Sequence, residues 1–99
     1  MAEPQRRENV PGLIYLLHFD RPLHHARHYL GWTEGETLTE RLDRHRSGHG
    51  SKLVAAVRRA GIDFKVARIW SGTRHDERKL KKSKNVPRRY CLICQGETA

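Results

Sequence analysis

A short apolar run near the N-terminus constrains the fold more than any other part of the chain. From Leu13 to Phe19, almost every side chain is apolar. Successive side chains of a strand point to opposite faces, so both faces of this segment would be apolar. One face would carry Leu13, Tyr15, Leu17 and Phe19, and the other Ile14 and Leu16. This pattern predicts a strand that is covered on both faces.

Turn and capping signals divide the middle of the chain into short elements. The segment 20–25 contains a proline and is predicted to be a hairpin loop. A second strand is predicted at about 27–33. Thr37 and Glu40 have the spacing of a capping box, in which each side chain satisfies a free backbone N–H group. We therefore expect a helix to begin there and to stop at Gly48.

The C-terminal half contains two more helices and one more strand. Ser51 can cap an amphipathic helix that Gly61 ends. A strand pattern returns at 63–70, and a last, mostly exposed helix is predicted at about 74–83. Residues 85–99 are predicted to form an irregular tail that contains a CxxC motif.

The order strand, strand, helix, helix, strand, helix predicts a small α+β domain. Its sheet should have three strands and be mostly antiparallel, with flanking helices. A chain of 99 residues is too short for two separate cores. We expect the domain at 12–84, after a polar N-terminal segment at 1–11 that is expected to be disordered.

The charge of the chain favours a polyanionic partner. Twenty Lys and Arg against eleven Asp and Glu give a net charge of +9 and a pI near 10.3, so nucleic acid is the first choice. No segment approaches the ~20 apolar residues of a membrane-spanning helix, and no signal peptide is recognised. Two cysteines cannot form a disulfide framework. We expect a soluble, cytoplasmic protein with no membrane partner.

Two tripeptides in the first two predicted strands resemble the motifs that name the GIY-YIG nucleases. They are Leu13-Ile14-Tyr15 and Tyr29-Leu30-Gly31. The resemblance continues with Arg41 in the next predicted helix and Glu77 in the last one, and it covers roughly 12–82. It implies the family's fold and an endonuclease that hydrolyses DNA phosphodiester bonds with Mg²⁺ or Mn²⁺.

The resemblance also implies a role for each matching residue. Tyr15 would be the general base, and Tyr29 would form a hydrogen bond near the phosphate. Arg41 would hold the scissile phosphate, and Glu77 would bind the metal ion. His45, one helical turn after Arg41, is a further candidate ligand of the phosphate or of water. Phosphodiester hydrolysis needs these functions: an activated water, a cation on the phosphate and help for the departing oxygen.

Each of these residues has a structural alternative. The tyrosines could be packed aromatics, Arg41 an exposed helix charge, and Glu77 the partner of Lys81 in an i,i+4 ion pair. A nucleic-acid-binding module with the same fold and no turnover is therefore the alternative function. In either case, basic side chains are expected to follow the phosphate backbone, in particular Arg44, Lys52, Arg78, Lys81 and Lys82.

Cys91 and Cys94 form half of a zinc site, because tetrahedral Zn²⁺ takes four ligands. His75, or the same cysteine pair from a second chain, could complete the site; otherwise the two are reduced thiols. A zinc-linked interaction domain is thus a further alternative, and the oligomeric state stays open. Three histidines near the predicted hairpin have no cysteine or carboxylate at ligand spacing and are expected to be solvated: His24, His25 and His28.

Overall fold

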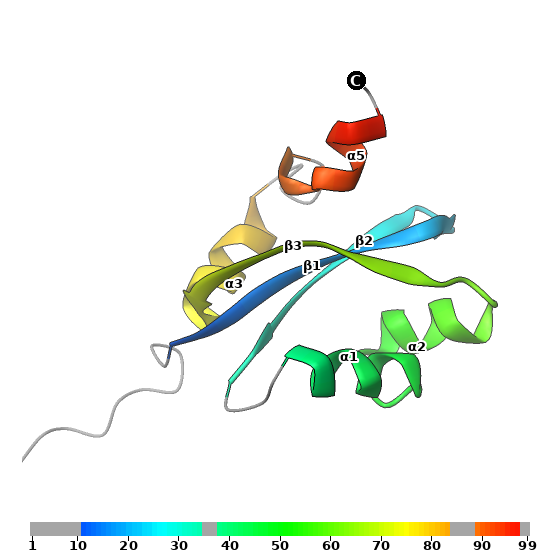
Figure 1. Ribbon diagram of the computed structural model, residues 1–99, viewed down its shortest axis with the longest axis horizontal. Helices are drawn as coiled ribbons and strands as arrows, with labels where there is room; N and C mark the ends of the chain where they lie inside the picture. The colour runs from blue at the N-terminus through cyan, green and yellow to red at the C-terminus, as the bar shows by residue number, and fades with distance from the viewer. Residues whose placement is uncertain (1–10, 35–37, 84–88, 98–99) are drawn as a thin grey trace, which may run out of the picture.

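The computed structural model describes residues 11–34, 38–83 and 89–97 of the chain (Figure 1). Within these residues, three strands form one antiparallel sheet in the order β2-β1-β3. The predicted α+β fold is confirmed. In chain order the elements are β1 (Pro11–Leu23), β2 (Ala26–Thr33), α1 (Leu38–Arg46), α2 (Lys52–Arg59), β3 (Phe64–Thr73), α3 (Arg74–Lys82) and α5 (Leu92–Glu97).

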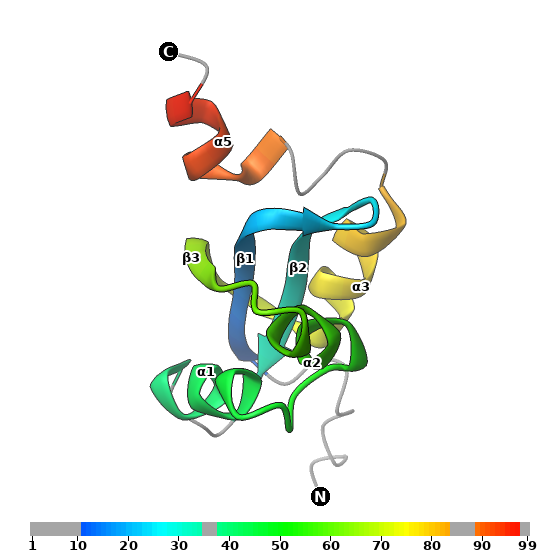
Figure 2. The same ribbon diagram turned by 90° about the vertical axis from the view of Figure 1, so that its right-hand side faces the viewer.

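The apolar run at the N-terminus forms the central strand, as its pattern predicts. Every residue of β1 from Ile14 to Phe19 is buried. The strand pairs with β2 on one side and with β3 on the other. Helices cover both faces of the sheet: α1 and α2 lie on one face, and α3 and α5 lie on the other (Figures 1 and 2).

The two faces of β1 belong to two separate hydrophobic clusters. On the α1/α2 face the cluster consists of Tyr15, Leu17, Phe19, Val54, Val57, Ile62 and Phe64. On the α3/α5 face it consists of Ile14, Leu16, Leu30, Ala67 and Cys91. Because side chains alternate along a strand, neighbouring residues of β1 and β2 contribute to different sides of the molecule. Two chemically different groups of side chains can therefore form on opposite faces.

The first hairpin is longer than its sequence pattern predicts. β1 continues to Leu23, which pairs with Ala26, so the turn is confined to His24 and the residue after it. The predicted loop at 20–25 is therefore wrong in its first part. The strand tolerates Pro22 because the β1–β2 pairing is irregular between His18 and Leu23, and proline is accommodated at bulges. His24 has a φ of 55°, the left-handed conformation of a tight turn.

Capping residues fix where the helices begin. The Ser51 hydroxyl accepts a hydrogen bond from the Val54 N–H at 3.0 Å and caps α2. Thr73 and Asp76 form a reciprocal capping box at the start of α3. Thr73 is also the last residue of β3, so α3 begins directly at the end of the sheet. The cap predicted at Thr37 lies outside the described residues.

The two ends of the chain differ from their predictions in one respect each. The tail predicted as irregular contains the short helix α5. Residues 1–10 of the N-terminal segment predicted as disordered lie outside the described part, and Pro11 already pairs with Thr73 in the sheet. Among the described residues, no helix combines the length and the apolar character that crossing a membrane requires.

Candidate functional site

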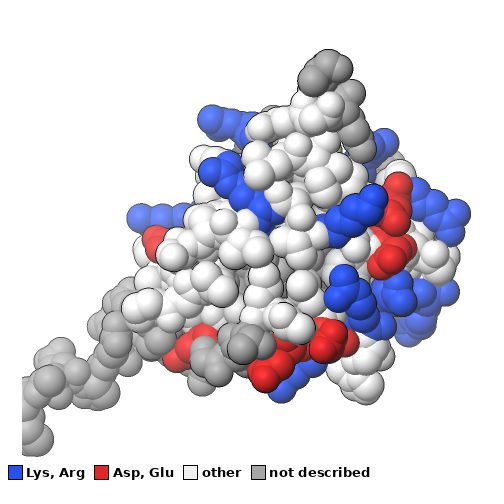
Figure 3. Space-filling view, in the orientation of Figure 1, with Lys and Arg blue, Asp and Glu red and all other residues white. Residues whose placement is uncertain are grey.

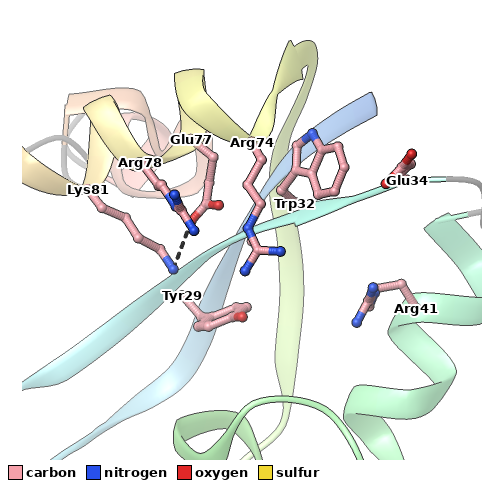
Figure 4. Close-up of a pocket in the computed structure, with 9 residues that line it drawn as sticks. Tyr29, Trp32, Glu34, Arg41, Arg74, Glu77, Arg78 and Lys81 are labelled. Carbon is pink, nitrogen blue, oxygen red and sulfur yellow. Dashed lines mark ion pairs between the residues drawn. The ribbon is translucent and has the colours of Figure 1, made fainter. Parts of the chain in front are cut away.

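A cavity of about 500 Å³ lies along the edge strand β2, between α1 and α3 (Figure 4). Side chains from both faces of the sheet meet at this edge. The cavity brings together three of the predicted catalytic residues, which come from three different elements. Its lining consists of Tyr29, Gly31, Trp32, Glu34, Arg41, Arg74, Glu77, Arg78 and Lys81.

The charges around the cavity favour an anion. Four of the lining residues are Lys or Arg and two are Glu, so cations outnumber carboxylates. Concave sites lined mainly by one sign of charge concentrate ions of the opposite sign. A phosphate group is one anion that such an arrangement suits.

Glu77 is a buried carboxylate in the cavity wall. Its side chain is only 8% exposed, and its Oε1 lies 2.8 Å from the Lys81 Nζ. The same ammonium group lies 5.4 Å from the centre of the Tyr29 ring. The ion pair offered as the structural alternative for Glu77 is therefore present, and the paired carboxylate still lines the cavity. A cation already occupies the position next to this carboxylate.

One face of α3 supplies four of the lining residues. Arg74, Glu77, Arg78 and Lys81 occupy positions i, i+3, i+4 and i+7 of the helix, and residues at this spacing share one helix face. Arg74 was not among the predicted site residues, although its helical spacing from Glu77 could have identified it. Trp32 and Glu34 were also missed. The Trp32 Nε1–H donates a hydrogen bond of 3.0 Å to the Gly72 carbonyl, which fixes the indole ring near the start of α3.

Tyr15 and His45 form a buried pair beneath the cavity. The Tyr15 hydroxyl and the His45 Nε2 are 2.7 Å apart, and each residue is 1% exposed. The ring centres of Tyr15 and Tyr29 are 6.3 Å apart, and those of Tyr29 and His45 are 5.3 Å apart. The structure thus brings His45 to Tyr15, and neither side chain belongs to the cavity lining, whereas Tyr29 does.

Gly31 explains how close the Tyr15 hydroxyl comes to the cavity. A methyl group at Gly31 would overlap the Tyr15 ring and its hydroxyl oxygen, and Gly31 itself lines the cavity. The hydroxyl therefore lies directly behind this part of the wall. Gly50 has a similar relation to His45, because a methyl group there would overlap the imidazole ring. Both rings of the buried pair thus pack against backbone that carries no side chain.

The buried imidazole is neutral at physiological pH. Burial, and to a smaller extent the charge of Arg41, lowers the pKa of His45 to about 4. A neutral imidazole has one acceptor nitrogen and one N–H. When the Nε2 accepts the hydrogen bond from the Tyr15 hydroxyl, the proton resides on Nδ1. In that arrangement the Tyr15 hydroxyl is the hydrogen-bond donor and the imidazole is the acceptor.

The predicted phosphate-contacting residues do not all lie together. Arg78 and Lys81 line the cavity, whereas Arg44, Lys52 and Lys82 are exposed outside it. In Figure 3, Lys and Arg side chains gather most densely at the right-hand end of the molecule, where α2 lies, with acidic side chains among them. The basic surface is therefore wider than the cavity.

A second group of chemically active side chains lies on the α3/α5 face of the sheet. We call it the His2Cys2 group; its members are His18, His28, Cys91 and Cys94. Each offers one ligand atom, and all four atoms lie within 4.8 Å of one another. This group could hold a metal ion.

Strand pairing and α5 build the His2Cys2 group. His18 on β1 is directly opposite His28 on β2, and their facing nitrogens are 3.3 Å apart. Cys91 immediately precedes α5 and Cys94 lies within it. Cys91 is fully buried and His18 is nearly so, whereas the other two are half-buried. Burial, together with the nearby charges of His18 and then Arg27, lowers the pKa of His28.

The ligands that complete the CxxC pair differ from those predicted. His75 is exposed on α3 and does not belong to the group. A second chain is not needed, because β1 and β2 supply both imidazoles. His24 and His25 are exposed in the turn, as predicted, but His28 is half-buried and faces the cysteines, so its prediction as a solvated residue is wrong.

Comparisons of this chain with protein-family models, curated proteins and solved structures found no match. The resemblance to the GIY-YIG nucleases thus stays an interpretation of the sequence motifs.

Proposed function

We propose that this chain is a metal-dependent endonuclease that hydrolyses phosphodiester bonds of DNA. The main support is that Tyr29, Arg41 and Glu77 come from three separate elements and line a single cationic cavity. The Tyr15 hydroxyl lies directly behind the cavity wall at Gly31. The resemblance to GIY-YIG nucleases selects these same two tyrosines, the arginine and the glutamate. Residues without a shared function would not be expected to meet at one cavity.

The arginines would bind the phosphate. Arg41 and Arg74 reach the cavity from opposite sides in Figure 4, one from α1 and one from α3. A guanidinium group presents N–H donors in a fixed fork that matches phosphate oxygens. Two such groups would orient a backbone phosphate and stabilise the negative charge that builds on it during hydrolysis.

Glu77 would hold the divalent ion. Its carboxylate lines the cavity and already faces one cation, the Lys81 ammonium at 2.8 Å, so the position suits positive charge. Mg²⁺ is commonly bound through one or two carboxylates, with water and substrate oxygens filling its other positions. Glu34 is a second carboxylate in the lining. When bound, Mg²⁺ or Mn²⁺ would neutralise charge on the departing oxygen.

The Tyr15–His45 pair would accept the proton from the attacking water. As the water oxygen bonds to phosphorus and the bond to the departing oxygen breaks, the Tyr15 oxygen takes a proton from the water. Its own hydroxyl proton moves to the His45 Nε2, 2.7 Å away. Because the pKa of His45 is lowered to about 4, the imidazole is a weak base and would hold that proton only while the water oxygen bonds to phosphorus. The departing oxygen takes a proton from bulk water.

Plasmid cleavage tests the proposal. We expect wild-type protein to nick or linearise DNA with Mg²⁺ or Mn²⁺ and to lose this activity with EDTA. Glu77→Gln should reduce the rate by roughly 10²–10³-fold, the usual effect of removing one group that stabilises a transition state. Glu40→Gln, the same substitution at an exposed position on α1, is the matched control and should cut normally. Equal rates for Glu77→Gln and wild type would contradict the proposal.

A nucleic-acid-binding module without turnover is the second candidate. The His2Cys2 group favours it, since zinc commonly holds small binding domains together and no member of this group lines the cavity. Such a module would bind DNA with a strong dependence on salt. It would leave DNA intact in every metal, and Glu77→Gln would bind as tightly as wild type or more tightly, because a carboxylate repels phosphate.

A further inference from the structure

Four of the six distances between ligand atoms of the His2Cys2 group are close to those of a tetrahedral zinc site, and the other two are within 4.8 Å. With Zn–N bonds of about 2.0–2.1 Å and Zn–S bonds of about 2.3 Å, a tetrahedron places two nitrogens ~3.3–3.4 Å apart and a nitrogen and a sulfur ~3.6 Å apart. The two imidazole nitrogens are 3.3 Å apart. The nitrogen–sulfur distances are 3.4 Å from Cys91 to His18, 3.5 Å from Cys94 to His18 and 3.4 Å from Cys94 to His28.

The surroundings of the group suit a bound cation. Cys91 lies within the apolar cluster of the α3/α5 face, beside Leu16 and Leu30. Buried polar groups are costly unless they are paired or coordinate a metal. The Cys94 backbone N–H also points to the Cys91 Sγ at 3.4 Å. A hydrogen bond of this kind stabilises a thiolate, the form of cysteine that binds metal.

We propose that the His2Cys2 group binds one zinc ion that fastens the C-terminal segment to the sheet. Two nitrogen and two sulfur ligands are a common set for structural zinc. All four positions are filled by the protein, and this is typical of a structural site, whereas a catalytic site keeps one position for water. The ion would be separate from the divalent ion of the proposed active site.

The C-terminal segment that contains α5 would be stabilised by such a link. α5 has six residues, and isolated helices of this length are unstable in water. Its Leu92 is 54% exposed, so only part of its apolar surface contributes to docking. His18 on β1 is 73 positions from Cys91 and 76 positions from Cys94 along the chain. A metal ion would therefore close a loop that includes most of the domain.

Metal analysis of the purified full-length chain is the first test. We expect one zinc per chain after dialysis, and the same content in Glu77→Gln, which separates this site from the proposed active site. Cys94→Ser should weaken zinc binding by more than the roughly 10–100-fold that loss of an outer hydrogen bond costs. His25→Ala, at an exposed neighbouring position, is the matched control and should keep its zinc.

A second measurement keeps the proposal testable if Cys94→Ser does not fold. Wild-type protein stripped of metal and loaded with Co²⁺ should show the intense visible bands of tetrahedral cobalt and a thiolate charge-transfer band. Removing the metal should also accelerate hydrogen exchange of α5 while α2 stays protected. Absence of stoichiometric zinc, stoichiometric content of another metal, or a cobalt spectrum without thiolate bands would overturn the proposal.

Discussion

The neutral, buried imidazole of His45 predicts a specific dependence of stability on pH. The pKa of His45 is about 4 in the folded chain and is expected near ~6.5 in the unfolded chain. The unfolded chain therefore binds the proton first as the pH falls. The stability that neutral His45 contributes is fully present above about pH 6.5, is lost progressively down to about pH 4, and changes no further below that.

The size of the effect follows from the two pKa values. Their difference corresponds to roughly 3 kcal/mol in total, and roughly 2 kcal/mol of this is lost between pH 7.5 and pH 5. His45 is 1% exposed, so solvent screening reduces the effect little. The Tyr15 hydroxyl, 2.7 Å from the Nε2, can accept a hydrogen bond from the protonated ring as well, and this makes roughly 3 kcal/mol an upper value.

Urea unfolding of wild type and His45→Gln, followed by tryptophan fluorescence at pH 7.5 and pH 5, measures this effect. Glutamine keeps a polar group beside Tyr15 and does not titrate. The other histidines contribute equally to both proteins, so they cancel in the difference. We expect the stability gap between the two proteins to shrink by roughly 2 kcal/mol at pH 5. A gap that stays constant would refute the assignment of His45 as a buried neutral base.

Two further substitutions test the packing and the charge of the cavity. Gly31→Ala should destabilise the fold by about 1–3 kcal/mol in urea unfolding, because the new methyl group overlaps Tyr15. The control Gly96→Ala places its methyl group in open space and should leave the stability unchanged. Equal stabilities of the two variants would contradict the close packing of Tyr15 against Gly31. Lys81→Met removes the cation that competes for Glu77 and should strengthen Mn²⁺ binding by up to roughly 1 kcal/mol, about fivefold, as followed by electron paramagnetic resonance. Unchanged Mn²⁺ affinity would argue against Glu77 as a ligand.

Local sequence signals were sufficient for most of the fold. The alternation along β1 and the cap at Ser51 depend on residues close together in the chain, and both are predicted correctly. The hairpin was predicted too short because Pro22 normally interrupts a strand, and a bulge in the pairing tolerates it here. α5 was missed because a six-residue helix depends on docking more than on its own sequence.

The candidate sites differ in how much the sequence could predict. Tyr29, Arg41 and Glu77 were selected through motifs, and the structure brings them to one cavity. The burial of Tyr15 behind Gly31 depends on how β1 and β2 pack and leaves no local signal.

The proximity of the two histidines in the His2Cys2 group could have been predicted from the sequence. A hairpin centred near position 23 pairs His18 with His28, so their proximity could have been inferred from the predicted strands. Their approach to Cys91 and Cys94 could not, because it depends on how the C-terminal segment crosses the α3/α5 face. Contacts between residues so far apart in the chain are set by tertiary packing alone.

The most direct test of the proposed active site is single-turnover cleavage of duplex, branched and single-stranded DNA, with binding measured on the same samples. We predict cleavage of at least one substrate that requires Mg²⁺ or Mn²⁺, and loss of cleavage without loss of binding in Tyr15→Phe and Glu77→Gln. Binding of every substrate without cleavage by the wild-type chain would contradict the account and favour the binding module.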